Sequence, residues 1–93
     1  MEKVLRCEVY SPEGGVFSGE ATKVVATAVD GEVGILFNHA PLVTTLGEGS
    51  LRITESGGDV ARFRARGGFL EVFRNHVTVL VESVEREDAE LSG

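Results

Sequence analysis

Hydrophobic and polar residues alternate along most of the chain, from residue 4 to residue 82. In the first such segment Leu5, Cys7 and Val9 fall on one side, and charged residues lie between them. This period of two is typical of β-strands with one buried and one exposed face. Because no helical period precedes Ser83, the pattern predicts an all-β fold: a two-sheet β-sandwich of about eight to ten short strands.

Glycine accounts for 12 of the 93 residues and lies mostly between the predicted strands. We interpret these glycines as tight turns, and we expect Gly47–Gly49 and Gly67–Gly68 to interrupt the strands beside them. The alternative is a phosphate-binding loop. It is disfavoured because Gly47–Gly49 lacks the third glycine of a dinucleotide fingerprint and the chain has no Gly-Lys-Ser/Thr motif. We therefore expect neither nucleotide binding nor a cofactor.

Residues 84–93 form a charged tail that differs from the β-sandwich expected over residues 1–83. Ser83 is a suitable N-cap and the acidic residues after it suit the first turn of a helix, so a short helix is one interpretation. A solvated tail is the other. It is favoured because so short a helix is marginal in isolation.

Charge and composition exclude several classes of function. The chain has 15 acidic and 9 basic side chains, a net charge of −6, whereas nucleic-acid binding needs a basic surface. No apolar run reaches the roughly 18–20 residues of a membrane span, and no signal peptide is apparent. The single cysteine, Cys7, fits a reducing compartment. Cys7, His39 and His76 are too far apart in sequence to suggest a metal site.

Arg62, Arg64 and Arg66 recur at every second position of one predicted strand, so they share one face of it. The favoured interpretation is a solvated outer face that discourages pairing with other chains. The alternative is a basic surface that binds an acidic partner, since arginine is enriched at interfaces. His39 lies in a predicted loop, where a structural hydrogen bond and a contact with a partner are equally good interpretations.

Several motifs occur together in a fixed order. Asp-Gly-Glu-Val-Gly-Ile-Leu at residues 30–36 is followed by His-Ala-Pro-Leu-Val-Thr at residues 39–44. The others are Val-Phe-Ser-Gly at 16–19, Gly-Gly-Phe-Leu-Glu-Val at 67–72 and Asn-His-Val-Thr-Val-Leu at 75–80. Together they resemble the N-terminal domain of the epsilon subunit of F-type ATP synthases, over nearly the whole chain.

The resemblance implies a β-sandwich, in agreement with the alternation, and a non-catalytic subunit of the central stalk. Such a subunit binds the gamma subunit and the polar loops of the c ring, rotates with them, and couples proton transport to ATP synthesis. It implies a peripheral location at the cytoplasmic face of a bacterial energy-transducing membrane, without insertion into the bilayer. A hydrogen-bonded two-layer core suits the transmission of torque because it resists deformation.

Four positions correspond, through the resemblance, to contact residues of that family. Glu32 matches a loop that faces the c ring, whose polar loops carry basic groups that a carboxylate complements. His39 and Thr44 match positions at the contact with gamma or the ring, and Ser11 matches a serine near gamma. The resemblance implies no catalytic, cofactor-binding or metal-binding residue.

The chain departs from the family pattern in two places. Phe37-Asn38 stands where the family usually has Pro-Gly, and asparagine tolerates a positive φ, so we expect the turn to persist. Most members also continue into a C-terminal helical hairpin that inhibits ATP hydrolysis and in some members helps to bind ATP. This chain stops at Gly93, so neither activity is expected.

Two other classes of function are alternatives. One is a small β-sandwich adaptor domain that binds proteins and is unrelated to the rotor. The other is an enzyme that uses His39 and Glu32 as acid and base, which requires both side chains in one deep pocket. The interpretation as a rotor subunit instead predicts that both are exposed at one end of the sandwich.

Overall fold

All regular structure in the described residues, 3–87 of a computed structural model, is β-strand. Apolar residues alternate with polar ones in each strand, and turns at glycine, asparagine or aspartate join consecutive antiparallel strands. The strands are β1 (Leu5–Ser11), β2 (Gly14–Ala28), β3 (Gly31–Ile35), β4 (Leu42–Glu55), β5 (Val60–Phe73) and β6 (His76–Arg86).

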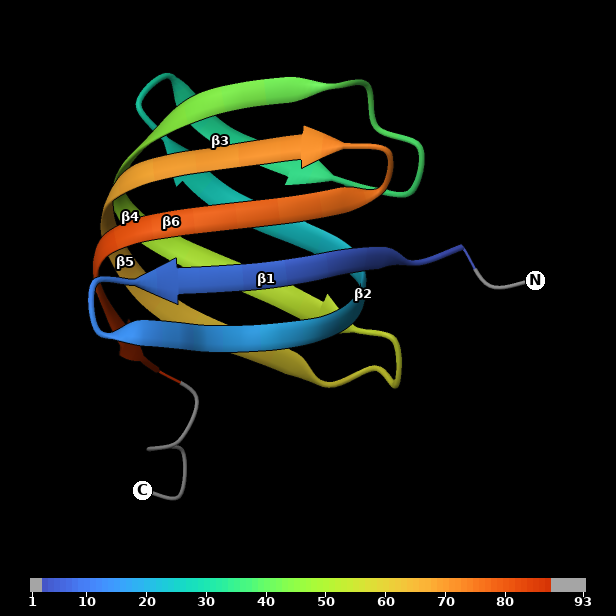
Figure 1. Cartoon of the computed structure of the whole chain (residues 1–93), viewed down its shortest axis with the longest axis horizontal. Coiled ribbons are helices and arrows are strands. Elements are labelled where there is room, and N and C mark those ends of the chain that lie inside the picture. Colours follow the sequence, from blue (N-terminus) through green and yellow to red (C-terminus); the bar gives the residue numbers. More distant parts are fainter. Residues whose placement is uncertain (1–2, 88–93) are drawn as a thin grey trace.

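The six strands form one strongly curled sheet in the order β1-β6-β5-β4-β2-β3. The sheet curls back on itself, because β1 pairs with the first half of β2 as well as with β6 (Figure 1). All pairings are antiparallel except that of β1 with β6. The result is a two-layer, barrel-like sandwich, which confirms the predicted all-β sandwich.

Long strands bend and contribute one half to each layer. The first layer holds β1, the early halves of β2, β4 and β6, and the late half of β5; the second holds β3 and the other halves. The expectation that Gly47–Gly49 and Gly67–Gly68 interrupt the strands is wrong. Pairing of β4 with β5 resumes beyond both, from Thr45↔Phe69 to Glu48↔Arg66. These glycines therefore bend the strands, which explains why the sequence pattern indicates more and shorter segments.

The core lies between the two layers and is entirely apolar among the described residues. Phe63 is its largest fully buried side chain, and no polar side chain is buried with it in residues 3–87. The inward positions are the alternating apolar positions of the sequence: Leu5, Cys7, Val9, Ala21, Val24, Ala26, Ile35, Leu46, Leu51, Ile53, Ala61, Phe63, Ala65, Leu70, Val72, Val77, Val79 and Val81.

Strand β6 continues into the segment for which a helix was one interpretation. Ser83 pairs with Arg66 and Arg86 pairs with Phe63, so residues 83–86 are strand and the helix does not begin at Ser83. The backbone N–H of Glu87 donates to the carbonyl oxygen of Arg62 at 2.8 Å and extends this pairing. The rest of the predicted tail, residues 88–93, lies outside the described residues.

Candidate interaction surfaces

The outer face of the first layer carries large apolar side chains that solvent reaches. Tyr10, Leu80 and Phe69 are cross-strand neighbours on β1, β6 and β5, with exposed fractions of 40%, 48% and 53%. Val43 on β4 and Phe73 near the end of β5 lie on the same outer face, at 68% and 53%, and the exposed Glu71 stands between Phe69 and Phe73 and opposite Val43. Soluble proteins expose large apolar clusters mainly where they bind a partner. We call these five residues the apolar face.

The apolar face was missed in the sequence, although a signal for it exists. Leu80 and Phe69 occupy outward positions that the alternation normally assigns to polar residues. Leu80 stands between the buried Val79 and Val81, and Phe69 precedes the buried Leu70. Large apolar side chains at outward positions of a strand indicate that another surface covers that part of the sheet.

Two predicted contact residues directly follow members of the apolar face in the chain. Ser11 follows Tyr10, and its hydroxyl oxygen accepts the backbone N–H of Glu13 at 3.2 Å, which helps to close the β1–β2 turn. Thr44 follows Val43 on β4, is half-buried and pairs with the buried Leu70. Both residues therefore lie within one residue of an exposed apolar side chain.

His39 lies in the loop between β3 and β4, which the β5–β6 turn holds in place. The backbone N–H of Asn38 donates to Oδ1 of Asn75 at 2.6 Å, and Nδ2 of Asn75 donates to Oδ1 of Asn38 at 3.2 Å. Asn38 has a φ of 67°, so the turn does form with asparagine in place of glycine. Nδ1 of His39 lies 2.7 Å from the carbonyl oxygen of Ala40, and the half-buried ring keeps a solvent-exposed part.

Glu32 lies apart from the other three predicted contact residues. It is exposed near the start of β3, just after the β2–β3 turn, and its Oε2 lies 3.5 Å from Nη2 of Arg52 on β4. His39 follows the other end of β3 (Figure 1). The expectation that Glu32 and His39 share one end of the sandwich is therefore wrong, because β3 runs between them. The same separation excludes the alternative in which Glu32 and His39 act as acid and base in one pocket.

Glu8 is the centre of a polar cluster beside the apolar face. The hydroxyl of Tyr10 donates to its Oε1 at 3.1 Å, Nε2 of His76 lies 3.4 Å from the same oxygen, and Nε of Arg6 lies 3.7 Å from Oε2. The hydrogen bond from Tyr10, followed by that from His76, lowers the pKa of Glu8 below its ordinary value. The same bond raises the pKa of Tyr10. The cluster joins β1 to β6, the one parallel pair.

Replacing Glu8 with glutamine is expected to lower the melting temperature at neutral pH but not in acid. Because the folded pKa of Glu8 is below its unfolded pKa, the carboxylate stabilises the fold at every pH above the unfolded pKa. That contribution is lost as the pH falls through the lowered folded pKa. Melting curves of both proteins across this range test the expectation. A difference that grew with acidity would contradict it.

Other potentially reactive groups in the described residues are few. Cys7 is fully buried, and burial raises the pKa of its thiol to about 12, so it is an inert core residue. Residues 3–87 contain no group of three or more His, Cys, Asp or Glu side chains placed to hold a metal ion. Over the same range, no helix is long and apolar enough to cross a membrane.

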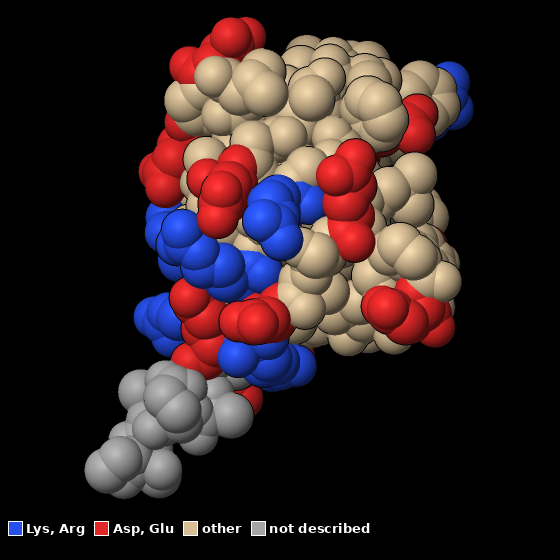
Figure 2. Space-filling model, turned by 90° about the vertical axis from the view of Figure 1, so that its left-hand side faces the viewer, with Lys and Arg blue, Asp and Glu red and all other residues tan. Residues whose placement is uncertain are grey.

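The second layer presents a different outer surface, on which charged side chains gather. Arg62, Arg64 and Arg66 are exposed on β5, as their alternation predicts. Figure 2 shows the molecule from the left-hand side of Figure 1. Basic and acidic side chains lie together on one part of this surface, beside a larger uncharged part. The fold and its surfaces thus define a small β-sandwich with two unlike outer faces.

The chain belongs to the ATP synthase delta/epsilon chain family, whose β-sandwich domain model matches residues 4–87. It is 46% identical over 88 residues to the ATP synthase epsilon chain of Desulforamulus reducens, covering 95% of this chain and 66% of the relative. It is 46% identical over 82 residues to that of Xanthomonas campestris (strain B100), covering 88% and 59%. The chain thus spans about three fifths to two thirds of these relatives' length.

Two solved structures share the fold at low sequence identity. A chain of the Euglena gracilis mitochondrial ATP synthase, in an assembly of OSCP, F1 and c ring, matches with a TM-score of 0.86 and 18% identity, over 99% of this chain and 59% of that one. A chain of the Tetrahymena thermophila mitochondrial ATP synthase central stalk and c ring matches with a TM-score of 0.72 and 19% identity, over 90% and 66%. These matches support the two-layer architecture.

Proposed function

We propose that this chain is a non-catalytic rotor subunit of a proton-translocating F-type ATP synthase. In this role it binds the gamma subunit and the c ring and helps to couple proton transport to ATP synthesis. It works at the cytoplasmic face of the membrane without entering the bilayer. Membership of the family, the epsilon-chain names of its relatives and the central-stalk assembly of a structural neighbour support this role. The observation that carries the proposal is the apolar face.

The apolar face is the surface we assign to gamma. Its central row crosses β1, β6 and β5, so a partner that lies on it contacts three hydrogen-bonded strands at once. Load applied to such a surface spreads through backbone pairing rather than through one flexible loop. Ser11 and His39 then lie at the margin of the gamma contact, where polar groups give specificity around an apolar centre. Thr44, the cross-strand neighbour of the buried Leu70, lies on the opposite side of β4 from Val43.

Glu32 is assigned to the c ring, because it is exposed at the opposite end of β3 from the His39 loop. Its carboxylate is held by Arg52 at 3.5 Å, yet more than half of its side chain stays accessible to a basic partner. Two partners can therefore bind at once without competing for one surface. This arrangement is what a subunit between a stalk and a ring requires.

Replacing Leu80 and Phe69 with serine is expected to weaken binding to the cognate gamma subunit strongly. A buried anchor residue at the centre of an interface contributes about 2 kcal/mol or more, so removing two such anchors should weaken binding at least about a hundredfold. Isothermal titration calorimetry with purified gamma measures this loss. The folded domain should keep its melting temperature, because both side chains are about half exposed already.

Two controls make the test specific. Val29, which is 60% exposed in the β2–β3 turn, is an apolar residue outside the apolar face, so Val29→Ser should leave gamma binding unchanged. Glu32→Gln should also keep gamma binding but weaken association with the c ring. Wild-type affinity in the Leu80/Phe69 variant, or no binding by folded wild-type protein at micromolar concentration, would refute the gamma assignment.

A further inference from the structure

The proposed function leaves the arginines of the second layer unused. Arg62, Arg64 and Arg66 stand at alternate positions of β5 on its outward side, and Arg52 on β4 is the cross-strand neighbour of Arg62. Alternate residues on one side of a strand are about 6.6–6.8 Å apart. Positive charges are therefore repeated at a regular spacing. We call these four residues the arginine face.

The charge of the arginine face is only partly neutralised within the molecule. Arg52 pairs with Glu32, whereas Arg62, Arg64 and Arg66 lie within salt-bridge distance of no carboxylate in residues 3–87. Arg66 faces Glu48 and Arg64 faces Glu85 across the strands, whereas Arg52 and Arg62 face each other directly, and like charges in that position destabilise a sheet. This arrangement gains stability if carboxylates from another molecule come between the guanidinium groups.

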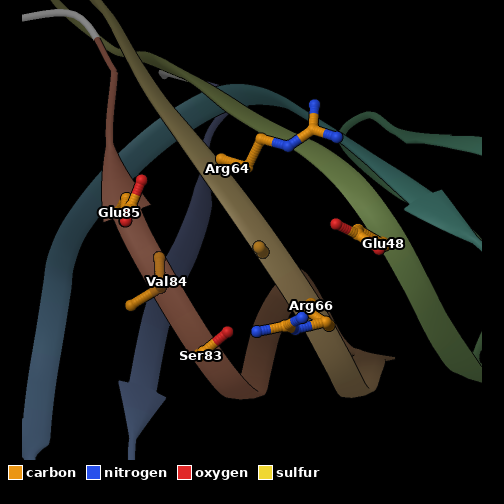
Figure 3. Close-up of a pocket in the computed structure, with 7 residues that line it drawn as sticks. Glu48, Arg64, Arg66, Ser83, Val84 and Glu85 are labelled. Carbon is orange, nitrogen blue, oxygen red and sulfur yellow. The ribbon is translucent and has the colours of Figure 1, made fainter.

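A groove runs beside two of these arginines. It has a volume of about 360 Å³, and the polar residues that line it are Arg64, Arg66, Ser83, Glu48 and Glu85. Figure 3 shows Arg66 extending toward Ser83, and Arg64 extending away from Glu85. Both arginines are exposed, so a carboxylate of another molecule can reach a guanidinium group and accept two parallel hydrogen bonds from it.

We propose that the arginine face binds an acidic protein segment that lies extended along β5. An extended chain with acidic residues at alternate positions repeats its carboxylates at the same spacing as the arginines. β5 is paired on both sides, with β4 and with β6, so it has no free backbone edge to offer. The segment therefore binds through side chains, and its sequence pattern determines recognition.

Flanking acidic residues favour a protein segment over a nucleic acid or an anionic membrane. Glu48 and Glu85 line the same groove as Arg64 and Arg66, and the whole chain has a net charge of −6. A polyphosphate backbone or a lipid surface brings closely spaced negative charges and would place some of them against these carboxylates. Glu48 lies directly opposite Arg66 and Glu85 directly opposite Arg64, so every anion at this groove meets them. A segment with one carboxylate at every second residue brings fewer negative charges near them than a polyphosphate backbone or a lipid surface does.

The test uses the full chain and a fluorescent peptide of alternating glutamate and alanine, followed by fluorescence anisotropy at low and at physiological salt. The wild-type protein should bind the peptide, more weakly as salt rises, and should not bind a peptide with glutamine in place of glutamate. The double variant Arg64→Gln/Arg66→Gln should bind at least about tenfold less tightly. If the double variant is less well folded, the two single variants replace it in the test, and each should lose less affinity for the peptide than the double variant.

Arg74→Gln is the matched control, since it removes the same charge from the β5–β6 turn, where Arg74 stacks on Phe73. It should leave peptide binding unchanged. The arginine variants should also keep gamma binding, which separates this proposal from the proposed function. Unchanged peptide affinity in a folded double variant would overturn the proposal. So would tighter binding to single-stranded DNA or to phosphatidylserine vesicles than to the peptide.

Discussion

Replacing Phe63 with alanine is expected to remove a large part of the stability of this domain. The side chain is 1% exposed and is the largest in the core, where it lies on the central strand β5 opposite Leu51. Truncating a buried phenylalanine costs about 3–5 kcal/mol, because transfer energy is lost and a cavity remains. The whole folding free energy of a small domain is only about 5–15 kcal/mol. The loss is therefore a large fraction of the free energy of unfolding.

Urea titration monitored by circular dichroism measures this loss of free energy of unfolding. The slope of that free energy against urea concentration should be the same for the wild-type protein and the variant. The matched control is Phe69→Ala, which makes the same substitution at a residue that is 53% exposed on the same strand. Phe69→Ala should change stability little and gamma binding strongly, whereas Phe63→Ala acts on stability. Equal destabilisation by the two substitutions would mean that Phe63 does not occupy the core as described.

The fold class could be predicted because alternation is a local property of the sequence. Leu5, Cys7 and Val9 are fully buried, as their spacing indicates. The pairing of strands could not be predicted in the same way. β1 lies parallel to β6, whose residues are more than sixty positions away, as in the pair Cys7↔Val77. Contacts between residues so far apart in the sequence depend on how the whole sheet curls, and a single sequence does not show this.

The glycines illustrate a second limit of sequence-based interpretation. A glycine pair in a strand pattern is typical of both a turn and a bend, since either can require a positive φ. At Gly67–Gly68 the structure shows a bend, with φ values of 71° and 108°, and the strand continues on both sides. Only the neighbouring strands decide between the two, because they either resume pairing beyond the glycines or do not.

The candidate site was predictable in part. The resemblance indicated Ser11, His39, Thr44 and Glu32, and the structure shows that they do not share one end of the molecule. Nothing in the local sequence gives the direction of β3, which separates Glu32 from His39. The role of all four in binding remains a prediction. The apolar face, by contrast, follows from outward positions in strands and needs only the register to become visible.

Replacing Gly68 with alanine is expected to be the other strongly destabilising change. Its φ of 108° is one that residues with a side chain rarely adopt, and a Cβ there would collide with the carbonyl oxygen of Leu80 on β6 and lie 2.9 Å from Cα of Val81. The neighbour is backbone, so the strain cannot be relieved by a side-chain rotation. Backbone strain and the displacement of β6 together should cost about 2–4 kcal/mol.

Gly57→Ala in the β4–β5 turn is the matched control, because nothing lies within 4 Å of its Cβ position and its φ is not positive. It should change the free energy of unfolding by no more than about 0.5 kcal/mol. Gly68→Ala should also weaken gamma binding, since it shifts Leu80 and Phe69 relative to each other, whereas Gly57→Ala should not. Equal stability of the two variants in urea would show that β5 does not approach β6 this closely at Gly68.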